Sequence, residues 1–463
     1  MSDFTSLSAL SLVELIRARE ISPVQVARSF LARIERLNPA LNAIVTLSPK
    51  LIDDARKAET ALMRGEQIGP LHGVPFTVKD TIDTDSLRTT SGSAMRADHI
   101  PDKDAPAVSR MRAAGAILLG KTNTAEMAMD YTADNPVFGR TNNPHDLSRT
   151  PGGSSGGEAA AIAACISVTG LGSDLAGSIR IPAHCCGVVG LKPGTSRVPG
   201  GGQCPASAGP YSLGSVIGPM ARYVADVQLL FRVLSGAASP IEDQRTVLPG
   251  QRVAWYTDDG ISPVTAETRA TVQSAAGALA DAGLLVEEQR PPSVEHALDM
   301  WLRLFSRASV VILRDMYASH EEKAGSFVSW RLANADDTPP PTLDDYIRSW
   351  LERDRLRARL IEWMRDTPLL LAPIGAAPAL KHDAHKVVVE GKSISAFRAF
   401  SYSQAFNVFD LPAVTVPAGR SSDGLPIGVQ IIGRPGDEET ILAAAQVVEE
   451  ALGGWQLPPM YKF

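Results

Sequence analysis

The chain has 463 residues, of which 44% are hydrophobic and 21% are charged, a composition typical of ordinary globular proteins. Its formal net charge of −6 excludes a scaffold that binds nucleic acid through a broad basic face. The four cysteines are too few for a disulfide framework, and no stretch reaches the roughly 18 apolar residues of a membrane span. We therefore expect a cytoplasmic protein without nucleic-acid or membrane partners, whose N-terminus is an amphipathic helix and not a signal peptide.

The N-terminal 65 residues are predicted to be mostly helical. Residues 22–38 have apolar side chains at helical spacing, with Ser22 placed as the N-cap and Pro23 in the first turn. Short apolar runs then predict strands, and one amphipathic run predicts a helix: strands at 41–47, 72–80 and 116–123, and a helix at 105–114. This alternation is typical of an α/β sheet that is covered by helices.

The middle of the chain changes character twice. Residues 131–157 are rich in Asn, Pro, Ser, Thr and Gly, and a loop of this length inside a compact domain is usually functional or disordered. The segment 236–365 is charged and helical, which predicts a cap or peripheral helices over the sheet. The remaining runs have core character: a helix at 158–166, strands at 187–193, 368–375, 412–419 and 427–433, and a closing helix at 437–452. The N-terminal and C-terminal parts are therefore predicted to share one sheet.

A serine hydroxyl becomes a good nucleophile only when a nearby base takes its proton. Histidine is the usual base, but only His184 lies near the serine-rich stretches, and its neighbours Cys185 and Cys186 favour a structural role for it. An unprotonated lysine is the other base that works with serine, and Lys79 ends an apolar run that would bury its stem. By itself this signal is weak, because most lysines after a strand are solvated or paired, and Asp80 is a candidate partner here.

The run from Asp174 to Ser178 follows a predicted strand end at 171–174. A tetrahedral intermediate needs backbone N–H donors that converge on its oxyanion, and a turn here would present consecutive amides beside the Ser178 hydroxyl. An ordinary Gly-Ser turn that joins a strand to a loop fits this short segment equally well.

A second serine motif, at 152–156, satisfies the G-x-S-x-G pattern of a nucleophile elbow. That motif requires a strand directly before it, whereas here a loop with Pro151 precedes it, so the interpretation fails. The stretch also lacks the lysine of a phosphate-binding loop, because Glu158 follows it. The adjacent His-Cys-Cys run at 184–186 has poor spacing for a metal site. We therefore expect neither a metal nor an organic cofactor.

Together these segments resemble the amidase signature family. The stretch 150–193, from TPGGSSGG to GLKP, is similar to the family's signature nearly throughout. Further similar segments lie at 70–80, 115–130 and 411–433, and the resemblance is weakest at 236–365. Agreement at several ordered segments is far more specific than any one motif.

The resemblance implies an α/β fold, namely an α/β/α sandwich with a large mixed central sheet covered by helices. We expect one domain over residues 1–463. Its parts in chain order are an N-terminal helical part (1–65), the signature core (66–235), a variable helical cap region (236–365), and C-terminal core strands and helix (366–463).

Carried over residue by residue, the resemblance implies a catalytic triad of two serines and a lysine. Ser178 matches the nucleophile, Ser154 matches the bridging serine, and Lys79 matches the terminal base. In the family the bridging serine follows a cis peptide bond, which here would join Gly153 to Ser154. The backbone N–H groups that match the oxyanion hole are those of Leu175, Ala176, Gly177 and Ser178.

Other positions are assigned from the same resemblance. The family usually has glycine where this chain has Ala176, whose β-carbon restricts φ and is expected to narrow the site while leaving the N–H donor intact. Asp174 and Arg180 match positions that brace the loops. Residues of the segment that lines the acyl pocket, together with the residue before the bridging serine, are the expected substrate contacts: Met129, Asp130 and Gly153.

The implied reaction is cleavage of a carboxamide through a Ser178 acyl-enzyme, with aryl anilides, carbamates (urethanase activity) and esters as further candidate substrates. We expect a small-molecule substrate and a monomer or homodimer. Two alternatives stay open: the amidase subunit of a tRNA-dependent amidotransferase, which frees ammonia from glutamine, and a non-catalytic relative. Trp301, Trp330 and Trp350 either line an aryl or alkyl pocket or pack in an amphipathic core.

Overall fold

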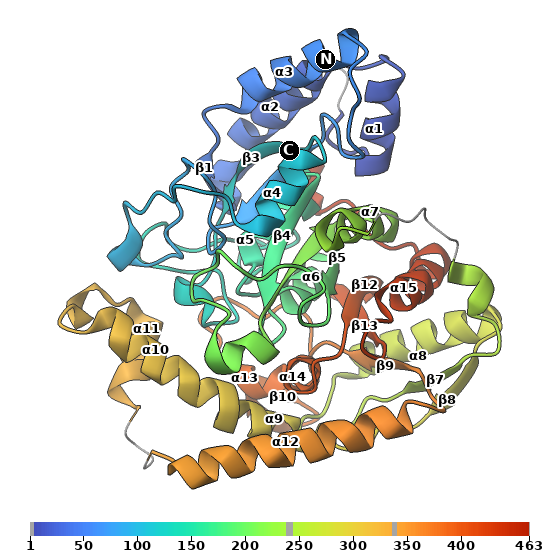
Figure 1. Cartoon of the computed structure of the whole chain (residues 1–463). Coiled ribbons are helices and arrows are strands. Elements are labelled where there is room, and N and C mark those ends of the chain that lie inside the picture. Colours follow the sequence, from blue (N-terminus) through green and yellow to red (C-terminus); the bar gives the residue numbers. More distant parts are fainter. Residues whose placement is uncertain (1–3, 238–243, 336–339, 463) are drawn as a thin grey trace.

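The computed structural model describes residues 4–237, 244–335 and 340–462. In these ranges one 11-stranded sheet runs through the molecule in the order β1-β3-β2-β4-β6-β5-β12-β13-β9-β7-β8 (Figure 1). Its strands are β1 Ile44–Leu47, β2 Pro75–Lys79, β3 Ile117–Thr122, β4 Thr169–Asp174, β5 Val189–Lys192, β6 Val216–Ala221, β7 Arg252–Trp255, β8 Leu285–Glu288, β9 Leu369–Pro373, β12 Ala413–Arg420 and β13 Pro426–Ile432. The strands β10 Lys386–Val389 and β11 Lys392–Ser395 form a separate hairpin.

The sheet is mixed, as the resemblance implies. Strand β2 runs parallel to both β3 and β4, and β7 runs parallel to both β8 and β9. The other neighbouring strands, from β4 through β6, β5, β12 and β13 to β9, are antiparallel. The parallel pairing at β2 follows from crossover connections through α4 (Pro106–Ala113) and α5 (Gly156–Ala163), because parallel neighbours cannot be joined by a tight hairpin.

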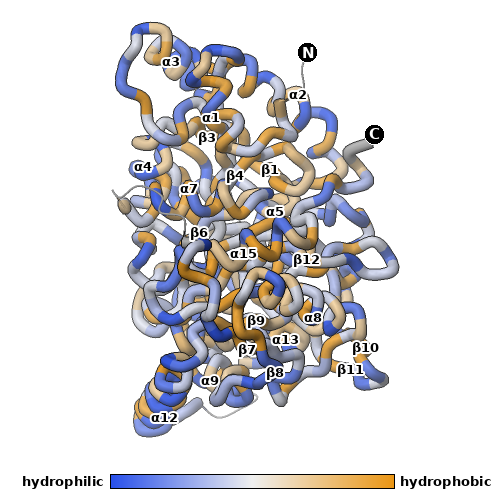
Figure 2. The backbone as a smooth tube through the Cα atoms, turned by 90° about the vertical axis from the view of Figure 1, so that its right-hand side faces the viewer, coloured by the Kyte–Doolittle hydropathy of each residue, from blue (hydrophilic) through white to orange (hydrophobic). Residues whose placement is uncertain are grey.

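Helices cover both faces of the sheet, which confirms the α/β/α sandwich. One face is covered by α4, α7 (Val224–Ser235), α8 (Ala266–Asp281) and α15 (Glu438–Leu452), which share one hydrophobic cluster with the strands. The opposite face is covered by α5 and α6 (Arg180–Cys186). Figure 2 shows the hydrophobic residues concentrated along the central strands.

The N-terminal helices α1 (Ala9–Arg17), α2 (Pro23–Leu41) and α3 (Leu51–Met63) lie together at the upper end of the molecule in Figure 1. Helix α2 begins as predicted, because the side chain of Ser22 accepts hydrogen bonds from the N–H groups of the first turn. The C-terminal end of the chain returns to this group of helices. There Trp455 packs against a hydrophobic cluster that contains residues of α1, α2 and α3.

The segment 236–365 differs from the expected helical cap. It does contain helices, at the left side and lower edge of Figure 1: α9 Ala297–Trp301, α10 Arg307–Tyr317, α11 Ser326–Ala333 and α12 Leu343–Trp363. However, it also supplies β7 and β8, which extend the main sheet beyond β9, and α8, which belongs to the sandwich. Both strands have only four residues, and most of β8 is exposed, so neither gives a clear alternation of apolar and polar residues.

None of the helices in the described parts of the chain combines the length and the apolar character that a membrane span requires.

Candidate active site

The lysine candidate lies at the end of a buried strand. In β2, Phe76 and Val78 point into the hydrophobic cluster under α4 and α7. Thr77 and Lys79 point to the opposite side by the two-residue period of a strand, and the hydroxyl of Thr77 donates to the carboxyl of Glu158 on α5. Lys79 is completely buried, as the apolar run that precedes it predicts.

Two serine hydroxyls meet the Lys79 amine. Its Nζ lies 2.6 Å from Oγ of Ser154 and 2.9 Å from Oγ of Ser173. Ser154 is fully buried and belongs to the loop that precedes α5, and the bond between Gly153 and Ser154 is cis. The structure thus brings together Lys79 and Ser154, whereas the contact with Ser173 was not predicted from the sequence.

The third member of the candidate triad lies next to this pair. The N–H of Ser155 donates to the carbonyl of Ser178 at 3.1 Å, so the loop with Ser154 runs beside the turn with Ser178. Ser178 is 7% exposed, and within the described residues its hydroxyl makes no hydrogen bond. A nearly buried hydroxyl with no fixed partner is free to turn toward a base or a substrate.

Burial changes the protonation of Lys79. Desolvation lowers its pKa from 10.5 to about 7, while the nearby carboxylates of Asp174 and Glu158 oppose this shift. The neutral amine is therefore well populated near pH 7, whereas an ordinary lysine is almost wholly charged there. Burial has the opposite effect on the carboxyl group of Glu158, whose pKa it raises to about 7. The hydrogen bonds that Thr77 and Thr122 donate to this group lower its pKa and so partly oppose the effect of burial.

The turn after β4 is organised by one buried carboxylate. Asp174 accepts hydrogen bonds from the N–H of Gly177 at 2.8 Å and of Ile179 at 3.1 Å, and it forms a buried ion pair with Arg180. Although burial raises the pKa of Asp174, the Arg180 guanidinium outweighs burial and holds it well below its usual range. The assignment of Asp174 and Arg180 as loop-bracing residues agrees with this network.

The turn needs glycine at position 177. Its φ is 105°, and a β-carbon there would come within 2.7 Å of side chains of Ile181 and Ser403. Ala176, by contrast, does not have a positive φ, so its β-carbon fits the backbone without strain. Within the described residues, the N–H groups of Leu175, Ala176 and Ser178 donate to no acceptor, whereas that of Gly177 is engaged by Asp174.

The three expected substrate contacts have different surroundings in the structure. A β-carbon on Gly153 would lie 2.1 Å from the carbonyl oxygen of Thr132, so only glycine lets the segment after Asp130 pack against this loop. Met129 is half-buried beside residues of α10 and α11. The half-buried carboxyl of Asp130 accepts from the N–H of Tyr131 at 2.7 Å and from the hydroxyl of Thr132 at 2.9 Å.

The structure also bears on three other features of the sequence: the 152–156 motif, His184 and a possible metal site. No strand precedes the 152–156 motif, so the structure has no nucleophile elbow there. Both ring nitrogens of His184 contact backbone groups: Nε2 faces the carbonyl of Ala377 at 3.1 Å, and Nδ1 accepts from the N–H of Gly428 at 3.0 Å. This agrees with a structural role for His184. Across the described ranges, no cluster of three or more His, Cys, Asp or Glu side chains could hold a metal ion.

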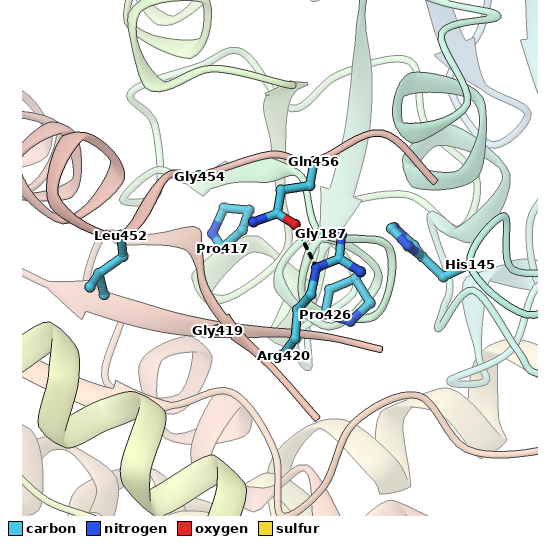
Figure 3. A pocket seen from close by; sticks show the side chains of 9 residues that line it. All are labelled: His145, Gly187, Pro417, Gly419, Arg420, Pro426, Leu452, Gly454 and Gln456. Carbon is cyan, nitrogen blue, oxygen red and sulfur yellow. Dashed lines mark hydrogen bonds between the residues drawn. The ribbon is translucent and has the colours of Figure 1, made fainter. Parts of the chain in front are cut away.

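A cavity of about 270 Å³ lies elsewhere, between the ends of β12, β13 and the C-terminal tail (Figure 3). Arg420 crosses it and donates through Nε to Oε1 of Gln456 at 2.8 Å. None of its lining residues belongs to the candidate triad or to the turn at 174–178.

Comparison with known proteins decides the family. A family model described as Amidase matches residues 25–442, which is most of the chain. The chain belongs to the amidase signature family. This amidase is a hydrolase that acts on amide C–N bonds.

The amidase is similar to proteins with different named roles. It is 30% identical to human fatty-acid amide hydrolase 2, over 98% of this chain and 90% of the relative. It is 33% identical to the A component of the glutamyl-tRNA(Gln) amidotransferase of Carboxydothermus hydrogenoformans, over 96% of this chain and 97% of the relative. Among solved structures, a bacterial aryl acylamidase of the same family superposes with a TM-score of 0.85 at 27% identity, covering 98% of each chain.

Proposed function

We propose that this amidase cleaves its substrate through an acyl-enzyme on Ser178, with Ser154 and Lys79 as the proton relay. The observation that supports this proposal best is the buried contact of 2.6 Å between Nζ of Lys79 and Oγ of Ser154. A base whose pKa is about 7 is matched to proton transfer near neutral pH, because its neutral form is well populated there.

The relay works in both directions. Neutral Lys79 accepts the hydroxyl proton of Ser154 while Ser154 accepts that of Ser178, whose Oγ attacks the carbonyl carbon. Ser154 then delivers a proton to the leaving nitrogen, the amine departs, and the acyl group stays on Ser178. Water attacks the acyl-enzyme with the same relay as base, which releases the carboxylic acid and restores the free hydroxyl.

We propose that backbone N–H groups of the turn at 175–178 donate hydrogen bonds to the oxyanion. The amides of Leu175, Ala176 and Ser178 are available to donate, while Gly177, the fourth predicted donor, gives the chain its sharp turn and donates to Asp174. The remaining expected contacts are proposed to form the wall around the scissile bond: Met129, Asp130 and Gly153.

We propose a cytoplasmic monomer or homodimer that acts on a small-molecule amide. The alternative, one component of a tRNA-dependent amidotransferase complex, is supported by the similarity to the glutamyl-tRNA(Gln) amidotransferase relative. That similarity is matched, however, by relatives named fatty-acid amide hydrolase 2 and acylamidase.

The purified chain alone is expected to hydrolyse simple chromogenic amides, because the relay and the turn both lie within one chain. The measurement is kcat/KM on a p-nitroanilide, a p-nitrophenyl ester and a p-nitrophenyl carbamate, compared with release of ammonia from glutamine. If all three chromogenic substrates stay intact and glutamine is cleaved only after the other amidotransferase components are added, the alternative function is correct.

Replacing Glu158 by glutamine is expected to move the acidic limb of the kcat/KM profile to lower pH. The carboxylate of Glu158 raises the pKa of Lys79, so its removal leaves the amine neutral at lower pH, and the midpoint of the acidic limb should fall. Glutamine keeps one acceptor oxygen for one of the two threonine hydroxyls, and its NH2 group can donate to the hydroxyl oxygen of the other, so thermal unfolding should confirm an intact fold. A midpoint that stays in place or rises contradicts the proposed coupling.

A further inference from the structure

Two aromatic side chains hold the carbonyl groups of the turn at 175–178. The indole Nε1–H of Trp301 donates to the carbonyl of Leu175 at 3.0 Å. The hydroxyl of Tyr131 donates to the carbonyl of Ala176, also at 3.0 Å. The two bonds reach successive peptide groups of one short turn, from side chains that lie far apart in the sequence.

Fixing a carbonyl also fixes the N–H of the same peptide group, because in a trans peptide the two point in opposite directions. The bond from Trp301 therefore makes the N–H of Ala176 point away from the indole. The bond from Tyr131 makes the N–H of Gly177 point away from the phenol, and this N–H does donate to Asp174 on the far side, at 2.8 Å. The peptide between Ala176 and Gly177 is thus held at both ends.

The direction of the Tyr131 hydroxyl is set by Gln404. Nε2 of Gln404 lies 2.8 Å from the Tyr131 oxygen and 3.3 Å from the carbonyl oxygen of Phe397. Since a carbonyl oxygen can only accept, the amide nitrogen of Gln404 must face both atoms and donate to Tyr131. The hydroxyl proton of Tyr131 is then left for the carbonyl of Ala176.

The two rings are themselves fixed by a third. Phe397, in the short helix α13 (Ala396–Ala399), stacks on Tyr131 with ring centres 5.5 Å apart and planes 13° apart. The same ring contacts Trp301 at a centre distance of 5.2 Å. Aromatic contacts of this kind restrict side-chain rotation, so both donors are held before any substrate arrives.

Trp301 comes from the part of the chain where similarity to the family is weakest. It ends α9, and a π-helical turn at Leu302–Ser306 follows directly. Single π-helical turns within helices are frequent at functional sites. Tyr131 comes from the loop that packs on Gly153, so the two donors approach the turn from separate parts of the fold.

We propose that Tyr131 and Trp301 are positioning residues that hold the 175–178 turn in the orientation in which its amides stabilise the oxyanion. This inference rests on the proposed function, because it assumes that charge develops at that turn. Neither side chain transfers a proton or forms a bond with the substrate. They restrict the motion of the peptide groups in the turn, so that the N–H groups are already oriented when negative charge develops on the substrate oxygen.

The test uses Tyr131→Phe and Trp301→Phe in the full chain, each of which keeps an aromatic ring and removes one donor. We expect kcat on a short-acyl p-nitroanilide to fall by about 10- to 100-fold in each variant, with KM changed by less than about threefold. A trifluoromethyl ketone adds to a catalytic serine to form a tetrahedral oxyanion. Its inhibition constant should rise in proportion to the loss of kcat/KM, as expected for a mimic of the transition state.

Tyr402→Phe is the matched control. Its buried hydroxyl also donates to backbone carbonyls, those of Thr257 and Ser262, but these lie outside the turn. A comparable loss of thermal stability is expected in Tyr131→Phe and Tyr402→Phe, whereas kcat and the inhibition constant should change only in the former.

Each outcome decides the proposal. If Tyr131→Phe and Trp301→Phe lose stability while kcat and the inhibition constant match wild type, the two side chains only pack, and the inference is overturned. If both variants raise KM alone, they bind substrate and do not position the turn. If Ser178→Ala retains activity, the proposed function fails and the inference fails with it, which separates the two cases.

Discussion

Replacing Ser178 by alanine is expected to reduce amide hydrolysis by at least about 10³-fold, because no acyl-enzyme can form without its hydroxyl. The fold should be unaffected, since within the described residues this hydroxyl makes no hydrogen bond. The measurement is kcat on a chromogenic anilide, with thermal unfolding of the same preparation as the check on folding.

Covalent labelling provides the control for this prediction. A fluorophosphonate should react with Ser178 in the wild-type chain, and peptide mapping should find the adduct on that residue alone. Labelling of Ser154 would instead mean that Ser154, and not Ser178, is the nucleophile. Substantial turnover by the Ser178→Ala variant would remove the basis of the proposed mechanism.

The second large effect is expected at Lys79. Below a pKa of about 7, kcat/KM of the wild type should rise about tenfold per pH unit, because only the neutral amine accepts a proton, and it should level off above that value. Lys79→Met fills the same buried space and removes the base. It should lose amide cleavage by more than about 10²-fold, and ester cleavage less, since an ester oxygen leaves without the proton that a leaving nitrogen requires.

Lys121→Met is the matched control for Lys79→Met. Lys121 is equally buried in the neighbouring strand β3, and burial lowers its pKa to about 8, but its Nζ contacts Thr84 and not the serines. Its replacement should lower thermal stability and leave the ratio of amide to ester activity unchanged. Equal loss of both activities in Lys79→Met, together with a flat wild-type profile, would mean that another group is the base.

Much of the sheet could be predicted because its strands are buried on both faces. The runs that became β2, β3, β9, β12 and β13 are mainly apolar with clear ends, and they occur where predicted. Strand β6 was missed because Gly218 and Pro219 interrupt its apolar run, although both residues lie inside the ladder with β4. Pairing with the neighbouring strands β4 and β5 stabilises this strand, although its local β-propensity is low.

In the candidate site too, residues that lie in a recognisable sequence motif could be predicted, whereas a residue that is brought there only by the fold could not. Lys79, Ser154 and Ser178 lie in stretches whose order and spacing resemble a known pattern, so sequence was sufficient to single them out. Trp301 offered no comparable signal, since a tryptophan at helical spacing is equally consistent with core packing. Its indole reaches Leu175 only because α9 lies over the turn, a relation that depends on the whole fold.

The position of β12 has a consequence for how the molecule is made. Strand β5 pairs on one side with β6, which is close in the chain, and on the other with β12, which leaves the ribosome only after the entire segment 236–365. For that period the nascent chain already contains both serines and the lysine, yet its half-built sheet ends in an unpaired apolar edge. Such edges invite association with other chains. We therefore expect an aggregation-prone stage during translation, which ends when residues 413–415 pair with β5.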